Sequence, residues 1–129
     1  MELRLTSVMV DNQDKALAFY VDKLGFVKSK DIPMGQFRWL TVTAPEGAEG
    51  VELLLEPMGF PPAVTFQREL FEAGIPATLF ISKDVAKEYE LLKARGVRFR
   101  GEPTRMGGVT VVLFEDTCGN LINLVQPES

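Results

Sequence analysis

The alternation of apolar and polar residues predicts the same order of elements in both halves of the chain. Short runs of β-branched and aromatic residues indicate strands, and apolar residues at i, i+3, i+4 and i+7 indicate helices. In the first half these patterns predict a strand at 3–10, a helix at about 14–24, and strands from about 26 towards 33, at 37–43 and at 51–57. In the second half they predict a strand at 77–81, a helix from about 85 to 95, and strands at 97–100, 109–114 and 121–127. Each half is therefore expected to be a βαβββ unit.

Two apolar stretches that end in proline support an internal repeat. They read V-E-L-L-L-E-P at 51–57 and L-I-N-L-V-Q-P at 121–127. Superposing them places Glu52 on Asn123, an offset of 71 residues. The same offset places Val10, at the end of the first strand, on Ile81. The repeat predicts that the two last strands are equivalent and present equivalent positions to a shared site.

The predicted elements define one domain of two units and a linker. Unit one covers residues 1–57, unit two covers 76–129, and residues 58–75 form a linker with a short helix at 63–73. A single unit has too little core to stand alone. Together the units predict an α+β fold, in which a curved eight-stranded mixed sheet carries its helices on the outer face. The inner face would then enclose a cavity, which is the usual form of a small-molecule site.

Histidine is absent from the 129 residues of the chain. It is the usual general base near neutral pH and the commonest metal ligand. Its absence excludes Ser-His-Asp and Cys-His catalysis and every metal site that needs an imidazole. Any chemistry must therefore use carboxylates, lysine, tyrosine, backbone groups or the single thiol, Cys118.

Composition narrows the range of partners and locations. A formal net charge of −4 argues against nucleic acid or an anionic membrane as the main partner. No apolar run approaches the ~20 residues that a membrane helix needs. The first residues lack the pattern of a signal peptide, and one cysteine allows no internal disulfide. We therefore expect a cytoplasmic protein.

Five stretches together resemble a known superfamily. They lie at 10–20, 23–26, 51–53, 91–97 and 116–122 and span nearly the whole chain. The chain resembles the vicinal oxygen chelate superfamily, which includes glyoxalase I, extradiol dioxygenases and the fosfomycin and bleomycin resistance proteins. The resemblance implies the glyoxalase-like fold of two βαβββ units. It says less about activity, because this fold hosts many functions.

The resemblance also implies where a metal would bind. Metal-dependent members take ligands from the first and last strands of each unit, as His, Gln or Glu. The corresponding positions here are Leu5 with Ser7 beside it, Glu52, the segment 76–78 that includes Thr78, and Asn123. Only Glu52 matches the pattern. We therefore expect no tightly bound metal cofactor, and a weakly held divalent cation is the alternative.

Five residues are candidates for ligand binding: Ser7, Arg38, Glu52, Thr78 and Asn123. Burial would raise the pKa of Glu52 and suit it as a general base, or Glu52 would bind a cationic group; a solvated carboxylate is the alternative. Asn123 would fix a ligand or bond a neighbouring backbone group. Arg38 would clamp an anion, and a surface arginine beside a core tryptophan is the favoured alternative.

Two other features have a structural interpretation. Cys118 lies in a predicted turn, and without a neighbouring histidine to lower its pKa we expect an inert thiol. The basic stretch of Arg98, Arg100 and Arg105 is expected to be the solvated face of an edge strand, where charge blocks association between sheets.

These observations favour a protein that binds a small organic ligand in the cavity of its curved sheet and forms a homodimer, as the resemblance to bleomycin resistance proteins implies. The alternative is a lyase or isomerase of the glyoxalase I type, with Glu52 as metal ligand or general base. The sequence leaves open whether the two units close on each other or on a second chain.

Overall fold

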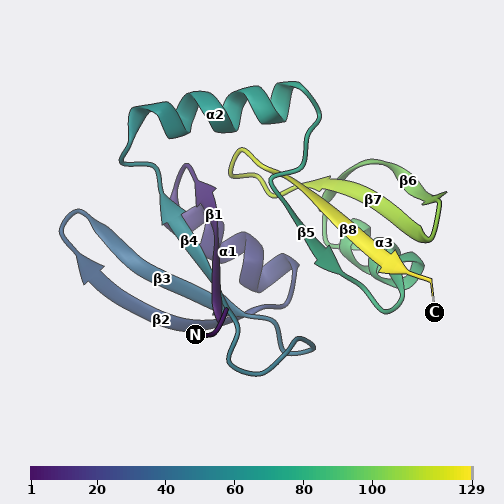
Figure 1. Ribbon diagram of the computed structural model, residues 1–129, viewed down its shortest axis with the longest axis horizontal. Coiled ribbons are helices and arrows are strands. Elements are labelled where there is room, and N and C mark those ends of the chain that lie inside the picture. The colour runs from purple at the N-terminus through teal and green to yellow at the C-terminus, as the bar shows by residue number, and fades with distance from the viewer. Residues whose placement is uncertain (129) are drawn as a thin grey trace.

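The computed structural model describes residues 1–128 and contains two βαβββ units that lie side by side (Figure 1). Unit one comprises β1 (Leu5–Val10), α1 (Gln13–Ala18), the π-helical segment η1 (Phe19–Lys23), β2 (Val27–Met34), β3 (Phe37–Thr43) and β4 (Glu52–Pro57). The linker contains α2 (Pro61–Glu72). Unit two comprises β5 (Thr78–Ile81), α3 (Val85–Ala94), β6 (Arg98–Met106), β7 (Val109–Glu115) and β8 (Leu121–Pro127). The predicted α+β class and the two βαβββ units are confirmed.

The strands form two four-stranded mixed sheets of the same topology. Sheet A has the order β1-β4-β3-β2, and sheet B has the order β5-β8-β7-β6. In each sheet the first and last strands of the unit pair in parallel, and the remaining neighbours are antiparallel. The eight strands are thus divided between two equivalent sheets, where we had expected one curved sheet.

Each unit's helix begins at a side-chain cap. The Asn12 side chain accepts a hydrogen bond from the Lys15 backbone N–H at 2.9 Å, and the Asp84 side chain accepts one from the Lys87 backbone N–H at 3.1 Å. Both side chains satisfy donors that a first helical turn leaves unpaired. The helical stretch formed by α1 and η1 ends at Gly25, which adopts a φ of 82° that a glycine reaches without strain.

The two caps correct the predicted superposition of the first strands. Asn12 and Asp84 are 72 positions apart, so Val10 corresponds to Ser82, and both side chains are buried. Ile81, which the 71-residue offset had placed on Val10, is instead exposed. Because side chains alternate along a strand, a one-residue error exchanges the two faces of the sheet.

The cores of the two units merge through aromatic side chains. Phe19 in η1 lies 6.2 Å from Phe114 of β7, measured between ring centroids, and Phe26 lies 5.5 Å from Phe80 of β5. Tyr20 packs edge-on to Phe80 at 6.5 Å. Such pairs contribute about 0.5–1.5 kcal/mol beyond the area that they bury. The helix side of unit one is therefore continuous with the core of unit two.

Polar contacts reinforce this junction. The Tyr20 hydroxyl donates to Asp116 Oδ2 at 2.7 Å. Lys23 Nζ donates to the carbonyl oxygen of Arg95 at 2.5 Å, and Arg95 Nη1 donates to the carbonyl oxygen of Lys23 at 2.8 Å. Lys23 and Arg95 occupy equivalent positions 72 residues apart, so their exchange of hydrogen bonds marks an approximate two-fold relationship between the units.

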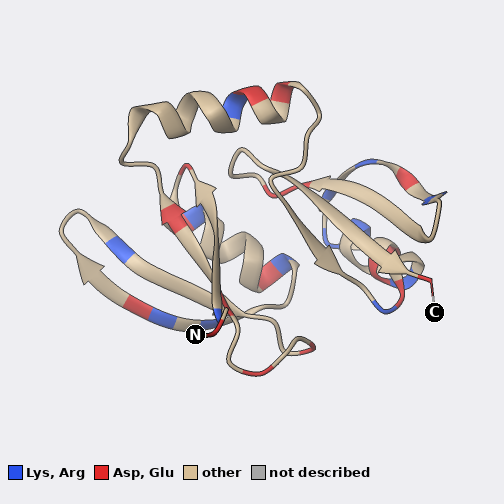
Figure 2. Cartoon of the chain, viewed as in Figure 1, with Lys and Arg blue, Asp and Glu red and all other residues tan. Residues whose placement is uncertain are grey.

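The linker helix α2 is fixed by one buried glutamine. Gln67 Nε2 lies 2.8 Å from the Met9 carbonyl oxygen, 3.1 Å from the Cys118 carbonyl oxygen and 3.1 Å from Asn120 Oδ1. Gln67 therefore joins α2 to both units. Figure 2 shows acidic and basic residues on β2 and in the C-terminal half of α2. Among residues 1–128, no helix is long and apolar enough to cross a membrane.

Candidate functional site

Each sheet buries one face against its helix, and we call the opposite face the inner face. On sheet A the register places Leu5 beside Glu52, and Thr41 beside both Leu54 and Lys30. Alternation along the strands adds further side chains to the same face, namely Ser7, Ile32, Met34 and Trp39. Ile32 is 50% exposed, and Met34 and Leu5 are also open to solvent. The inner face of sheet A is thus a largely apolar surface around the Glu52 carboxylate.

Glu52 is held by two polar neighbours on this face. Its Oε2 accepts from Lys30 Nζ at 2.6 Å, and its Oε1 accepts from the Thr41 hydroxyl at 2.6 Å. The Thr41 Oγ1 in turn accepts from the Lys30 backbone N–H at 3.0 Å. The Lys30 ammonium, followed by the Thr41 hydroxyl, lowers the pKa of Glu52 to about 2. We had expected burial to raise this pKa, and at neutral pH so acidic a carboxyl is a weak general base.

Ser7 lines a crevice next to this face. The crevice has a volume of about 290 Å³ and lies between β1, α2 and the start of β5. Its other walls come from Val8, Met9, Phe66, Gln67, Leu70, Pro76, Ala77 and Asn120. Ser7 shares the inner face with Glu52, because Leu5 pairs with Glu52 and Ser7 is two residues further along β1. The structure therefore brings these two candidates to one face of sheet A.

Asn123 and Thr78 lie on opposite faces of sheet B. Asn123 pairs with Leu79 on one side and Leu113 on the other. Thr78 pairs with Ile122, which belongs to the helix-side core. Asn123 therefore lies on the inner face, where its neighbour from β5 is the exposed Leu79. Thr78 points to the other side and does not join Asn123.

Arg38 lies on the helix side of sheet A, away from Glu52. Its guanidinium donates to both oxygens of Asp31, at 3.0 and 3.1 Å, and forms an ion pair with Asp14 of α1. Hydrogen bonding to Arg38 lowers the pKa of Asp31. The hollow that Arg38 borders has a volume of about 440 Å³ and is separate from the Ser7 crevice. Arg38 joins β2, β3 and α1 through these two carboxylates.

The residues at the metal positions of the superfamily do not suit a metal. Leu5 offers no ligand atom, and both oxygens of Glu52 already accept hydrogen bonds, one of them from an ammonium group. Asn123 belongs to the other sheet. In residues 1–128 no group of three or more Asp, Glu, Cys or His side chains is placed to hold a metal ion. The donor set is too poor for a tight divalent site.

Cys118 and the basic stretch of Arg98, Arg100 and Arg105 were given structural interpretations from the sequence. Cys118 is buried, and burial raises the pKa of its thiol to about 12. The strand β6 is the edge of sheet B, and Arg98 and Arg100 lie 4.0 and 3.5 Å from the carboxylate of Glu115. Arg105 forms an ion pair with Glu128. The edge position of β6 agrees with the expectation from the sequence, and the inertness of the Cys118 thiol stays a prediction.

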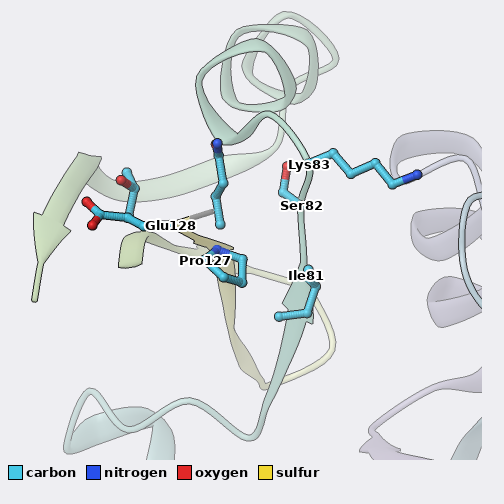
Figure 3. Close-up of a pocket in the computed structure, with 7 residues that line it drawn as sticks. Ile81, Ser82, Lys83, Pro127 and Glu128 are labelled. Atoms are coloured by element: carbon cyan, nitrogen blue, oxygen red, sulfur yellow. The ribbon is translucent and has the colours of Figure 1, made fainter. Parts of the chain in front are cut away.

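A larger hollow lies at the C-terminal ends of β5 and β8 (Figure 3). Its volume is about 730 Å³, and it is lined by Ile81, Ser82, Lys83, Thr110, Gln126, Pro127 and Glu128. Figure 3 shows the Lys83 side chain extending away from Glu128. The Glu128 carboxylate is already paired with Arg105, and the hollow contains none of the sequence-predicted candidates. We therefore place the candidate site on the inner faces.

Sequence reasoning missed two polar residues. Lys30 was not recognised because a β-bulge between Lys28 and Lys30 shifts the alternation of side chains along β2. The side of the sheet on which Lys30 lies therefore does not follow from its spacing to the preceding residues. Asp116 was assigned only to a turn, yet it is fully buried, and burial raises the pKa of its carboxyl against the effect of its hydrogen bonds. A carboxylate directly before a glycine-containing turn was the available signal for Asp116.

Comparison with known proteins identifies the family. The profile of the Glyoxalase/Bleomycin resistance protein/Dioxygenase superfamily matches residues 3–124, and the chain belongs to this superfamily. The chain is 52% identical to the uncharacterized protein YurT of Bacillus subtilis (strain 168) over 126 residues, which are 98% of this chain and 99% of YurT.

Two solved structures share the fold of this chain, and their sequence identities to it are similar to each other. The crystal structure of UcmS2 superposes with a TM-score of 0.82 at 31% identity and covers 97% of both chains. TnmS3, an antibiotic binding protein from Streptomyces sp. CB03234, superposes with a TM-score of 0.76 at 33% identity, over 99% of this chain and 97% of TnmS3. The superfamily recognised from the sequence is therefore confirmed, and one structural relative binds an antibiotic.

Proposed function

We propose that this protein binds a small organic ligand on the inner face of sheet A, without a tightly bound metal. The observation that carries the proposal is an apolar, solvent-open face with a single hydrogen-bonded ion pair, Lys30–Glu52. Ligand sites combine apolar walls with a few polar groups that fix orientation. The antibiotic-binding TnmS3, which shares the fold and a third of the sequence, supports this class of function.

The protein acts as a homodimer in this proposal. The sheets lie side by side in the chain, so neither covers the inner face of the other (Figure 1). Exposed apolar residues lie on both inner faces, with Ile32 and Met34 on sheet A and Leu79 and Ile81 on sheet B. A second copy related by two-fold symmetry covers both at once, when sheet A of each chain meets sheet B of its partner. Large exposed apolar patches mark such interfaces.

The enzymatic alternative has less support. A glyoxalase I type lyase or isomerase would use Glu52 as general base or metal ligand. Its hydrogen bonds to Lys30 and Thr41 lower its pKa to about 2 and occupy both oxygens, which suits neither role. Binding is therefore the function that we advance.

Ligand binding can be followed through Trp39, the single tryptophan of the chain. We would titrate the wild type with a panel of aromatic antibiotics and of divalent cations, and measure Trp39 fluorescence and the melting temperature. We expect saturable quenching and stabilisation by organic ligands, since a ligand specific for the native state stabilises it by about 2.7 kcal/mol at a hundredfold excess over Kd. Ile32→Glu should abolish binding.

The matched control is Leu91→Glu, which alters a similarly exposed side chain on α3. It should bind like the wild type. Two results would overturn the proposal. One is stabilisation by a single cation that is lost in Glu52→Gln, and the other is turnover of a hemithioacetal that is lost in the same variant. Either result would establish the enzymatic alternative.

A further inference from the structure

Lys30 presents a fixed positive charge on the inner face of sheet A. Its ammonium group carries three donors, and one of them is directed to Glu52 Oε2 at 2.6 Å. The Lys30 side chain is 49% exposed, whereas the Glu52 side chain is 19% exposed. The charge that a ligand meets on this face is therefore the ammonium and not the carboxylate.

Both oxygens of Glu52 already have a partner within the protein. One oxygen accepts from Lys30 and the other accepts from the buried hydroxyl of Thr41. A cationic ligand would compete with the Lys30 ammonium for the same carboxylate and would be repelled by it. A ligand with an acceptor oxygen instead adds a hydrogen bond to a donor that is already in place, and hydrogen bonds from charged donors are among the strongest in proteins.

We propose that Lys30 is the residue that determines ligand specificity, and that the site selects a carbonyl, phenolate or carboxylate oxygen attached to an aromatic or apolar body. This inference rests on the proposed function and names its ligand class. Trp39 and Ile32, which share the face with Lys30, supply the apolar contact for that body.

The surrounding charges support this selectivity. Lys28 and Asp31 lie on the opposite side of β2, 3.9 Å apart, and Asp31 is also paired with Arg38. On the inner face of sheet A, β4 also carries the exposed Glu56, which lies four residues along the strand from Glu52. When a ligand body or a partner chain excludes water, the interaction of an acceptor with Lys30 strengthens, because the local dielectric constant falls.

Lys30 also explains why the carboxylate at the metal position needs no metal. An internal ammonium neutralises Glu52 at hydrogen-bonding distance, which is the electrostatic role that a bound cation has at such a position. Because this cation is part of the chain, it cannot be removed by a chelator. Ligand binding should therefore be unchanged by EDTA.

The test uses two probes of the same size and opposite charge, 2-naphthoate and 2-naphthylmethylammonium. Their dissociation constants would be measured by calorimetry and by Trp39 fluorescence with the wild type, Lys30→Met and Lys30→Arg. We expect the wild type to bind naphthoate at least about tenfold more tightly, a difference of about 1.4 kcal/mol. Lys30→Arg should retain the preference, and Lys30→Met should abolish it.

Lys28→Met is the matched control. It removes the same charge from the same strand, but from the opposite face, and should keep the wild-type preference. Equal or tighter binding of the ammonium probe to the wild type would overturn the inference and leave the proposed function standing. Equal loss of preference in Lys28→Met and Lys30→Met would overturn it too, since it would reveal a general charge effect. Failure of both probes to bind would reject the proposed function itself.

Discussion

The Tyr20 hydroxyl donates to Asp116 Oδ2 at 2.7 Å, across the junction between the two units. Both side chains are fully buried. Asp116 also accepts hydrogen bonds from the backbone N–H groups of Cys118 and Asn120 and from Asn120 Nδ2. A buried carboxylate is tolerated only when its oxygens are satisfied in this way. The contact therefore ties the first helix of unit one to the β7–β8 connection of unit two.

Tyr20→Phe should destabilise the protein by about 1–3 kcal/mol, because it removes a donor from a buried charged group. The free energy of unfolding would be measured by urea denaturation. Tyr89→Phe is the control, since no hydrogen bond of the Tyr89 hydroxyl occurs within residues 1–128 although the ring is buried. Similar losses in both variants would contradict an important role for the Tyr20–Asp116 contact.

Glu52 should contribute stability that depends on pH. Its pKa is lowered in the folded state from 4.5 to about 2, so the contribution is complete above pH 4.5 and is lost as the pH falls towards 2. Glu52→Gln should remove this part of the pH dependence of unfolding. Glu56→Gln, which alters an exposed carboxylate of the same strand, should preserve it. Parallel curves for wild type and Glu52→Gln would contradict the prediction.

Cys118 should be unreactive in the native protein. Burial raises its thiol pKa to about 12, and the thiolate is the reactive form. Labelling with a disulfide reagent at about pH 8 should be slow in buffer and fast in urea, because only unfolding exposes the thiol. Native labelling as fast as that of the unfolded chain would show that the β7–β8 connection opens readily.

Gly119 should tolerate no side chain. Its φ is 96°, and an added Cβ would lie 2.6 Å from Gln67 Oε1. Gly119→Ala therefore combines backbone strain of about 1–2 kcal/mol with a steric clash. Gly101→Ala is the matched control, because Gly101 has a φ of 97° and open space around it. Thermal unfolding should show a larger loss for Gly119→Ala, and Gln67→Ala should relieve the difference.

The proposed dimer makes a prediction for sheet B. Ile81→Glu places a charge on an inner face that we expect a partner chain to cover, and unpaired charges at such contacts are costly. Light scattering should therefore show a shift from dimer to monomer. Leu91→Glu, on the outer helix α3, should remain dimeric. A monomeric wild type would refute the assembly.

Most of the fold could be predicted from the sequence, because the main helix of each unit carries both of its end signals. Asn12 and Asp84 cap the helices, and Gly25 and Gly96 end them with positive φ. Strand β3 was predicted with its observed bounds, Phe37–Thr43. The prediction of one curved sheet was less accurate. The pattern of apolar and polar residues alone does not show which strands of the two units lie next to each other.

The candidate site was predicted only in part, and the reason is the two-residue period of strands. Glu52 was recognised from the resemblance, but the bulge in β2 concealed its partner Lys30. Alignment uncertainty at the start of unit two led to Thr78, although Asn123 shares its face with Leu79. Such errors of one residue move a side chain from the cavity to the core.

The exchange of hydrogen bonds between Lys23 and Arg95 shows how closely the two units still resemble each other in backbone geometry. Their inner faces have nevertheless diverged, since sheet A carries the Lys30–Glu52 pair where sheet B carries the uncharged Asn123. The charges on the inner face of sheet B lie towards its β6 edge instead, where Arg98 and Arg100 approach Glu115. In the proposed dimer the two walls of every cavity therefore place their charges differently. A ligand with a single polar end then meets different partners on the two walls, a polarity that four identical units could not impose.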